Sequence, residues 1–155
     1  EAEWEKAARG GGLGLNFGWG GADTISHSQA NFYSYWTNGV PAEAFDVSAQ
    51  EGYHPDYVTA PVPYTSPAGV FVPNGFGVCD ASGNVTEWCW DTYDEDYYAG
   101  SPAENPRGPG WGDIKVGRGG SWNHSASGCR VSSRGASSAI GSSSFAGFRL
   151  VRRVP

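Results

Sequence analysis

The sequence predicts an α+β fold built from short antiparallel strands, few helices and a large share of irregular loop. Three features of its 155 residues lead to this expectation. Glycine occurs 24 times, which weakens helix interiors and disfavours a helix bundle. Aromatic residues make up 14% of the chain and charged residues only 17%, a balance that disfavours disorder. No apolar run approaches the roughly 20 residues that a membrane-spanning helix needs.

The expected elements follow in order along the chain. Residues 1–9 should be helical, because their apolar side chains fall on one helical face. Residues 10–21 form a glycine-rich turn region. Residues 22–68 are irregular, and such a long stretch in a compact domain is usually functional or held in place, for example by an ion. Residues 91–113 form a second, acidic loop. Short strands are expected at Val70–Val72, Gly77–Cys79, Val85–Trp90, Val116–Gly119 and Phe148–Val151.

Residues 121–147 consist mostly of Ser, Gly and Ala, a composition typical of a flexible linker. This segment nevertheless lies between two expected strands and is rich in large anchors, which a linker does not need. We therefore expect an ordered surface region whose small side chains are exposed. The expected anchors are Trp122, Arg130, Arg134, Phe148 and Arg149.

The net charge of −6 argues against general nucleic-acid binding. The charge is unevenly distributed, because all 16 acidic residues lie in 1–113 and 7 of the 10 basic residues lie in 114–155. Two interpretations are open. The two parts could pack together and neutralise each other, or the basic part could form a face that attracts an anionic partner.

The three cysteines allow at most one disulfide, and their spacing matches neither a CxxC pair nor a zinc site. Small buried thiols are therefore expected at Cys79, Cys89 and Cys129. The three histidines are too scattered to suggest a metal site. We expect ordinary surface histidines at His27, His54 and His124.

Four motifs occur in order along the chain: EAEWE-AARGG at 1–11, G-x-x-D-x-x-GNV-x-EW at 77–88, RGGSW at 118–122 and GFRLVR at 147–152. Together they resemble the formylglycine-generating enzyme (sulfatase-modifying factor) family. The resemblance implies a single domain over 1–155 with a variant of the C-type lectin fold and bound calcium. The usual N-terminal part of the family is missing, so we expect a fragment of a larger protein, without a membrane span, that is exported or located at the cell surface.

The resemblance also implies the calcium ligands, and Ca²⁺ prefers six to eight oxygen ligands from carboxylates, amides and carbonyls. The first site would use two side chains and two backbone carbonyls, from Asp80, Glu87, Gly83 and Val85. The second would use the side chains of Asn31 and Glu51 and the carbonyls of Phe32 and Tyr53. In the alternative, Glu87 pairs with an arginine such as Arg118 or Arg149, and no metal binds.

The oxidase chemistry of the family, as the resemblance implies, needs two cysteines that bind copper and attack a substrate disulfide. In this sequence Cys129 matches the second cysteine, and His124 stands at the position of the first. Imidazole can bind copper, but it cannot form a mixed disulfide with a substrate thiol. Copper and formylglycine formation are therefore not expected, and no catalytic residue is assigned. Cys129 is interpreted as structural rather than nucleophilic.

Two other branches of this superfamily lack the cysteine pair. The sulfoxide synthases bind iron through a histidine triad on a separate domain, which this sequence does not contain. The variable proteins of diversity-generating retroelements display a variable patch between RGGSW and GFRL, where mutated adenine-rich codons yield Ser, Gly, Ala, His, Ile, Phe, Asp or Tyr. Residues 123–145 fit that pattern, although Ser and Gly are also common in ordinary loops. The expected ligand-binding residues are Trp122, Asn123, His124, Ser125, Ser127, Gly128, Ser133, Gly135, Ser137, Ser138, Ile140, Ser142, Ser143, Ser144 and Phe145.

The sequence therefore favours a non-catalytic protein that presents a surface patch at 123–145 on a calcium-braced scaffold. Exposed side chains on a rigid scaffold can change with little effect on stability. The expected ligand is a protein or a cell-surface molecule. The alternatives are a copper oxidase acting on a sulfatase cysteine, a fragment of a sulfoxide-synthase-like enzyme, and a structural subunit without a ligand.

Overall fold

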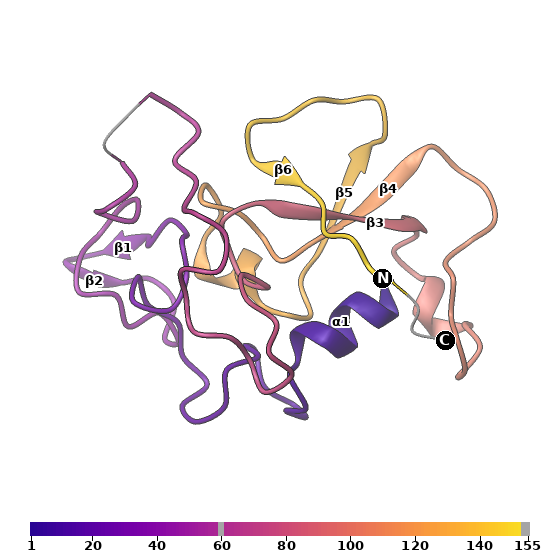
Figure 1. Cartoon of the computed structure of the whole chain (residues 1–155), viewed down its shortest axis with the longest axis horizontal. Helices are drawn as coiled ribbons and strands as arrows, with labels where there is room; N and C mark the ends of the chain where they lie inside the picture. Colours follow the sequence, from indigo (N-terminus) through magenta and orange to yellow (C-terminus); the bar gives the residue numbers. More distant parts are fainter. Residues whose placement is uncertain (59–60, 153–155) are drawn as a thin grey trace.

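The computed structural model describes residues 1–58 and 61–152. Figure 1 shows a small sheet with a short helix packed beside it, and a loop-rich region that carries two minute strands on the other side. The elements are α1 (Ala2–Ala8), β1 (Trp36–Thr37), β2 (Val40–Pro41), β3 (Thr86–Thr92), η1 (Tyr97–Ala99), β4 (Ile114–Arg118), η2 (Ala126–Cys129), β5 (Arg134–Ser138) and β6 (Ala146–Gly147). The predicted α+β class with few helices and much loop is confirmed.

The main sheet has four strands in the order β5-β4-β3-β6. Strands β3 and β4 are antiparallel, with Glu87 opposite Arg118, and their register shifts between Trp88 and Thr92. Strand β5 pairs antiparallel with β4 over its whole length. Strand β6 pairs parallel with β3, so the sheet is mixed and not purely antiparallel as expected.

Of the five expected strands, those at 85–90 and 116–119 are confirmed within a few residues by β3 and β4. The other three are wrong. Residues 70–72 form no strand, with Phe71 buried between the exposed side chains of Val70 and Val72. Residues 77–79 belong to a turn closed by the side chain of Asn74. Residues 148–151 form no strand, because the pairing with β3 is made two residues earlier, by β6.

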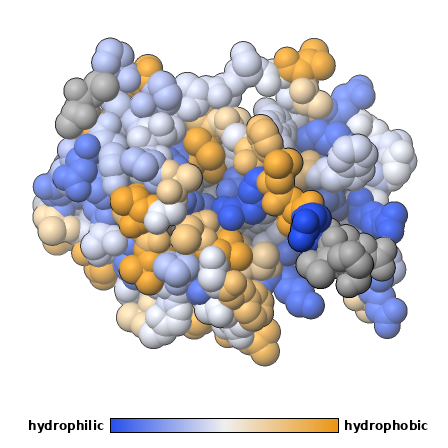
Figure 2. Space-filling model, in the orientation of Figure 1, coloured by the Kyte–Doolittle hydropathy of each residue, from blue (hydrophilic) through white to orange (hydrophobic). Residues whose placement is uncertain are grey.

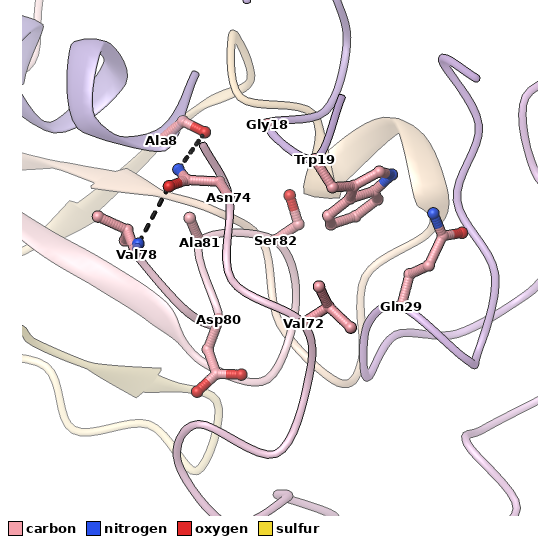
Figure 3. A pocket seen from close by; sticks show the side chains of 10 residues that line it. All are labelled: Ala8, Gly18, Trp19, Gln29, Val72, Asn74, Val78, Asp80, Ala81 and Ser82. Atoms are coloured by element: carbon pink, nitrogen blue, oxygen red, sulfur yellow. Dashed lines mark hydrogen bonds between the residues drawn. The ribbon is translucent and has the colours of Figure 1, made fainter. Parts of the chain in front are cut away.

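Helix α1 is attached to the rest of the protein by Asn74. The Asn74 amide donates to the carbonyls of Ala7 and Ala8 at 2.7 and 3.0 Å, and its oxygen accepts from the backbone N–H of Val78 at 3.0 Å (Figure 3). These bonds satisfy carbonyls at the helix end that have no partner within the helix. The chain is tightly packed here, since a Cβ on Gly75 would lie 2.3 Å from the carbonyl oxygen of Gly10.

Arg118 is the largest fully buried side chain and joins three parts of the fold. Its guanidinium donates to the carboxylate of Glu5 on α1 and lies over the ring of Trp4 at 5.3 Å. It also donates to three successive carbonyls just before β5, at 2.6–3.0 Å: Val131, Ser132 and Ser133. The end of β4, the helix and the start of β5 are therefore fixed by one charged group.

The charge pairs support the interpretation that the acidic and basic parts of the chain neutralise each other. Arg134 donates to the carboxylate of Glu1 at 2.7 and 3.1 Å. Arg149 makes two bonds of 2.6 Å to the carboxylate of Glu87. With Arg118, three of the seven basic residues of 114–155 are thus paired with acids of the first part.

The core is small and built around the packed side chains of Phe17, Ile25, Ala30, Phe32, Ala126 and Cys129. All three cysteines are free, and Cys129 is fully buried, as expected, whereas Cys79 and Cys89 are half-buried. Figure 2 shows apolar residues on the surface, interleaved with polar ones. No helix within residues 1–58 and 61–152 is long and apolar enough to cross a membrane.

We expect the Arg118→Leu substitution to lower the free energy of unfolding by about 3–5 kcal/mol, because it leaves buried carbonyls and a carboxylate without their partner. Chemical denaturation followed by circular dichroism measures this loss. The matched control is Arg107→Leu, because Arg107 is exposed and should change stability by less than about 0.5 kcal/mol. An equal effect of the two substitutions would contradict the central role of Arg118.

Candidate functional site

Residues 123–145, called here the patch segment, leave and rejoin the scaffold at one turn. At the start, the backbone N–H of Trp122 donates to the carbonyl of Asn84 at 2.9 Å. At the end, the carbonyl of Phe145 accepts from the N–H of Thr86 at 2.8 Å. The turn itself depends on Gly83, which has a φ of +76° and whose Cβ would lie 2.3 Å from the carbonyl oxygen of Asn31. Both ends of the patch segment are therefore anchored through its backbone.

The side chains of the patch segment are mostly exposed, and the structure divides the expected ligand-binding residues into three groups. The exposed group is Asn123, Gly135, Ser137, Ile140, Ser142, Ser143, Ser144 and Phe145. The half-buried group is His124, Ser125, Ser127, Gly128, Ser133 and Ser138. Trp122 forms a third group alone, because it is only 4% exposed. The prediction of an ordered surface region is confirmed by η2 and β5, which both lie within it.

Trp122 forms the floor of this surface and does not belong to its contact face. Its ring packs on Tyr53 and Tyr64 with centroids 5.7 and 5.2 Å apart. Its indole N–H donates to the carbonyl of Ser144 at 3.2 Å and so supports the returning loop from below. The expectation that Trp122 contacts a ligand is corrected on this basis, because a buried ring cannot also face a partner.

Arg134 and Arg130 brace the patch segment, as expected. Arg134 binds Glu1 and lies over the rings of Tyr93 and Tyr98 at 4.9 and 5.1 Å. Arg130 donates to the carbonyl of Ser127 at 3.1 Å and lies over the ring of Phe45. The expected anchor Phe148 is wrong, because its side chain is 72% exposed.

One residue that the sequence did not single out holds the first part of the patch segment. The carboxylate of Glu43 accepts from the backbone N–H of Ser127 at 2.9 Å and from the hydroxyl of Ser125 at 3.3 Å. Glu43 lies in the irregular region before residue 68, where no sequence pattern marks it. Residues 125–127 are therefore tied to the scaffold, whereas the side chains of 139–145 point to solvent.

The pair formed by His124 and Cys129 does not have the properties of a thiolate centre. Cys129 is completely buried, and this burial raises the pKa of its thiol far above the ordinary value, with a further contribution from the charge of Glu43. The thiol is therefore protonated at neutral pH. His124 is bonded to the hydroxyl of Ser121 at 2.7 Å, and burial lowers the pKa of its imidazole.

At the first expected calcium site, only one of the two carboxylates has a free, buried oxygen. Asp80 Oδ1 is buried without a hydrogen-bond partner, while its other oxygen accepts from the N–H of Gly69 at 2.5 Å. Figure 3 shows the Asp80 carboxylate turned away from Asn74, at the edge of a hollow of about 10 Å³. Glu87, in contrast, is occupied by Arg149 and by the indole N–H of Trp4. The Glu87–Arg149 pair is thus present, as the alternative interpretation expected.

The second expected site also offers a buried oxygen without a partner. Asn31 is 1% exposed, and its amide N–H donates to the carbonyl of Tyr64 at 2.7 Å, whereas its Oδ1 accepts no bond. Glu51 is exposed, and the carbonyl oxygen of Phe32 is hydrogen-bonded to Nε2 of His27 at 3.2 Å. The backbone N–H of Asn84 donates to the carbonyl of Asn31 at 2.7 Å, so the two expected calcium segments touch each other.

The oxygens of Asp80 and Asn31 fit a cation, since buried acceptors without a donor are costly. Within the described part of the chain, no three His, Cys, Asp or Glu side chains gather around one point. A site would therefore depend on backbone carbonyls for most of its ligands, whereas the resemblance implied two side chains and two carbonyls in each site. This is compatible with Ca²⁺, which accepts carbonyl oxygens, and not with zinc.

Two histidines that were expected at the surface are buried. His27 and His54 are 8% and 5% exposed, and their rings lie 5.3 Å apart. The Nδ1 of His54 accepts from the N–H of Asp56, and its Nε2 donates to the carbonyl of His27. His54 is therefore a neutral imidazole. His27 has one ring nitrogen on the carbonyl of Phe32 and the other buried without a partner, so protonation would bury an unpaired N–H.

Residues 1–154 match the family described as the sulfatase-modifying factor enzyme 1-like domain. A formylglycine-generating enzyme from Streptomyces coelicolor is 38% identical over 152 residues, which cover 96% of this chain and 44% of that protein. Among solved structures, PvdO from Pseudomonas aeruginosa aligns with a TM-score of 0.68 and 29% identity, over 95% of this chain and 48% of PvdO. Treponema denticola variable protein 1 aligns with a TM-score of 0.63 and 28% identity, over 95% and 44% of the respective chains. The chain thus spans somewhat less than half the length of these proteins.

Removal of the Trp122 ring should destabilise the protein. We expect Trp122→Ala to lower the free energy of unfolding by about 3–5 kcal/mol, because it removes a buried aromatic ring and leaves a cavity. Trp111→Ala is the matched control, because Trp111 is 75% exposed. Urea denaturation of both variants measures the difference, and a near-neutral Trp122→Ala would show that the ring is not a structural support.

The buried histidines should make stability depend on pH. Burial lowers the pKa of both His27 and His54 from the ordinary 6.5, and the neighbouring His54 lowers that of His27 further. Asp46 acts in the opposite direction on His27, as does Asp56 on His54. Because the unfolded chain then binds more protons than the folded one, stability is full above about pH 6.5 and is lost as the pH falls through the lowered values.

We therefore expect the melting temperature to fall between pH 7.5 and 5.5. The same pH series on His54→Gln should show a shallower fall, even if this variant is less stable throughout. An unchanged pH dependence in His54→Gln would contradict the assignment.

Proposed function

The chain belongs to the sulfatase-modifying factor enzyme 1-like domain family, and from this premise we propose that it presents a ligand-binding surface and does not carry the family's oxidase chemistry. The patch segment is that surface. The proposal rests on one observation: within 122–145, the residues that hold the segment in place differ from those whose side chains face solvent. Backbone bonds to Asn84 and Thr86 fix the ends of the segment, and buried or paired side chains hold it from below, while most of the exposed side chains serve neither purpose.

The similarity to Treponema denticola variable protein 1 supports this proposal, since a protein of that name shares the fold over 95% of this chain. The small residues between 123 and 145 agree with a surface whose side chains vary among related copies. A partner would be a protein or a cell-surface molecule that covers the exposed residues. The floor beneath them would stay constant, because it is built from Trp122 and its tyrosine neighbours.

The oxidase alternative requires a reactive thiolate, and the cysteine that matches the family's pair, Cys129, is buried and protonated. A partner thiol is lacking, because His124 occupies the position of the other cysteine. Oxygen uptake in the presence of Cu(I) and a cysteine-containing peptide tests this alternative. We expect no uptake above a protein-free control, and peptide-dependent uptake would overturn the proposal in favour of an enzyme.

A library experiment tests the proposal directly. Ser137, Ile140, Ser142 and Ser143 are randomised together in a yeast-displayed protein, because all four are exposed. Most members should fold and melt within a few degrees of the parent, and selection against streptavidin should yield binders. The matched control library randomises four buried positions of the same region: Ser121, Ala126, Cys129 and Val131. If the first library unfolds as often as the control, the patch segment is part of the core, and the proposal fails.

The coding DNA offers an independent test. A variable patch of this kind needs an adenine-rich near-repeat of the 3′ coding region close to the gene, from which new versions are copied. Sequencing the flanking DNA should reveal such a copy of the segment that encodes 122–147. Its absence, together with invariant patch residues in sibling strains, would contradict variability.

We further propose that calcium braces the scaffold through the buried oxygens of Asp80 and Asn31. Bound Ca²⁺ would supply positive charge to acceptors that otherwise lack donors. Chelation with EDTA should therefore lower the melting temperature by several degrees, since a ligand that binds only the folded state stabilises it. The shift should shrink in Asp80→Ala and persist in Asp113→Ala, because Asp113 is exposed. A melting curve that EDTA does not move would refute the calcium brace.

A further inference from the structure

Four tyrosine rings beside the patch segment pack against one another at the surface. Tyr33 lies 4.4 Å from Tyr35 and 4.7 Å from Tyr53, and Tyr53 lies 4.9 Å from Tyr64, all between ring centroids. Tyr35 is 51% exposed, and the other three are half-buried, so the rings share one solvent-facing surface. We call these four residues the tyrosine face. None of them belongs to the patch segment.

The backbone explains how the tyrosine face forms. Ser34 and Gly52 exchange two hydrogen bonds of 2.9 Å as an isolated antiparallel bridge. In such a pair, the residues on either side of the bridge point to the same face. Tyr33 therefore lies opposite Tyr53, and Tyr35 lies opposite Glu51. The side chain of Ser34 points the other way and is buried against Asp46.

The chain segments that form the tyrosine face carry acidic and no basic side chains. Residues 10–106 contain no lysine or arginine, whereas Glu43, Glu51 and Asp56 lie within the same segments as the tyrosines. Glu51 is exposed on the face of Tyr35, and Glu43 follows directly after Ala42, whose N–H donates to the carbonyl of Tyr35. Electron-rich ring faces and carboxylates both attract cations.

The protein already pairs aromatic rings with cations elsewhere. Arg134 lies over Tyr93 and Tyr98, and Arg118 lies over Trp4. Within residues 1–58 and 61–152, no internal cation lies over any ring of the tyrosine face. The nearby Arg130 lies over Phe45 instead.

The tyrosine face is continuous with the patch segment. The hydroxyl of Tyr53 donates to the side-chain oxygen of Asn123 at 3.1 Å, and the N–H of Tyr33 donates to the carbonyl of His124. On the other side, Glu43 binds the backbone of Ser127. A partner seated on the first part of the patch segment would therefore also cover the tyrosine face.

We propose that the tyrosine face is a constant subsite for an arginine or lysine side chain of a protein partner. The guanidinium or ammonium group lies against the rings of Tyr33 and Tyr35, and Glu51 supplies the counter-charge at the rim. This assignment rests on the proposed function in one respect, namely that the partner is a protein bound at the adjacent patch segment. The patch segment then determines which partner binds, and the tyrosine face supplies an attraction that every cationic partner shares.

The test is an NMR titration of the full chain with an acetylated and amidated Gly-Arg-Gly-Arg-Gly peptide. The matched probe replaces both arginines by citrulline, which keeps the shape and removes the charge. We expect the arginine peptide to bind at least about ten-fold more tightly and to shift the aromatic signals of Tyr33 and Tyr35. Tyr35→Leu should weaken binding about two- to five-fold, as expected for the loss of one exposed cation–π contact. Tyr35→Phe should retain binding, and Tyr97→Leu, outside the face, serves as the control.

Equal affinity for the citrulline peptide, or unchanged binding by Tyr35→Leu, would overturn the assignment. The melting temperature of each variant confirms that it is folded, and Tyr35 is used because half of its surface is already exposed. A variant with Ser137, Ile140, Ser142 and Ser143 all changed should bind the arginine peptide like the parent. If the patch library fails while the peptide still binds at the tyrosine face, the proposed function falls and the cation subsite stands.

Discussion

The buried guanidinium of Arg118 is the interaction on which the rest of the structure depends. It is the last residue of β4, yet its bonds reach Glu5 on α1 and the carbonyls of 131–133. Those carbonyls immediately precede β5, so the position of β5 and of the loop that follows it is set from the interior. The two terminal nitrogens of Arg118 make all of these bonds, while its buried Nε has no hydrogen-bond partner. Because a buried charge is costly unless it is paired, these bonds require the three segments to assemble together.

Elsewhere, short polar side chains do the work that regular secondary structure does in other folds. Asn74 holds the end of α1, Asn84 exchanges bonds with the backbone of Ser66, and Asp23 accepts from the N–H groups of Asn16 and Phe17. Each of these side chains binds backbone groups that would otherwise be buried without partners. A chain with so few strands can therefore remain ordered over long irregular stretches.

The sequence predicted those features that depend on local pattern. The helix at 1–9 and the strands β3 and β4 follow from periodic or β-branched and aromatic residues. Strand β5 was not predicted, because its Arg-Gly-Ala-Ser-Ser sequence has no strand preference and it becomes a strand through pairing with β4. The burial of His27 and His54 was not predicted either, because it is decided by distant segments that pack over them.

The candidate site also has some features that the sequence predicts and others that it does not. The exposure of most of 137–145 could be predicted from composition, and Trp122 was expected as an anchor of the segment. Glu43 could not be found, because a lone acid in an irregular region carries no signal until its partners are known. The tyrosine face did leave a trace in the alternate spacing of Tyr33 and Tyr35. Its meaning depends on the pairing of Ser34 with Gly52, which the sequence does not reveal.

These contacts divide the patch segment into two parts that differ in how well they tolerate substitutions. Around 123–128, the side chains and backbone are coupled to Glu43, Tyr33 and Tyr53, so a substitution there disturbs fixed neighbours. Around 139–145, the segment is held chiefly through its backbone and through the Trp122 bond to Ser144, which any residue at 144 can accept. Substitutions without loss of stability are therefore expected mainly in the second part. The proposed attraction for a cationic partner would depend on the first part, because there the rings and carboxylates of the scaffold are fixed in place.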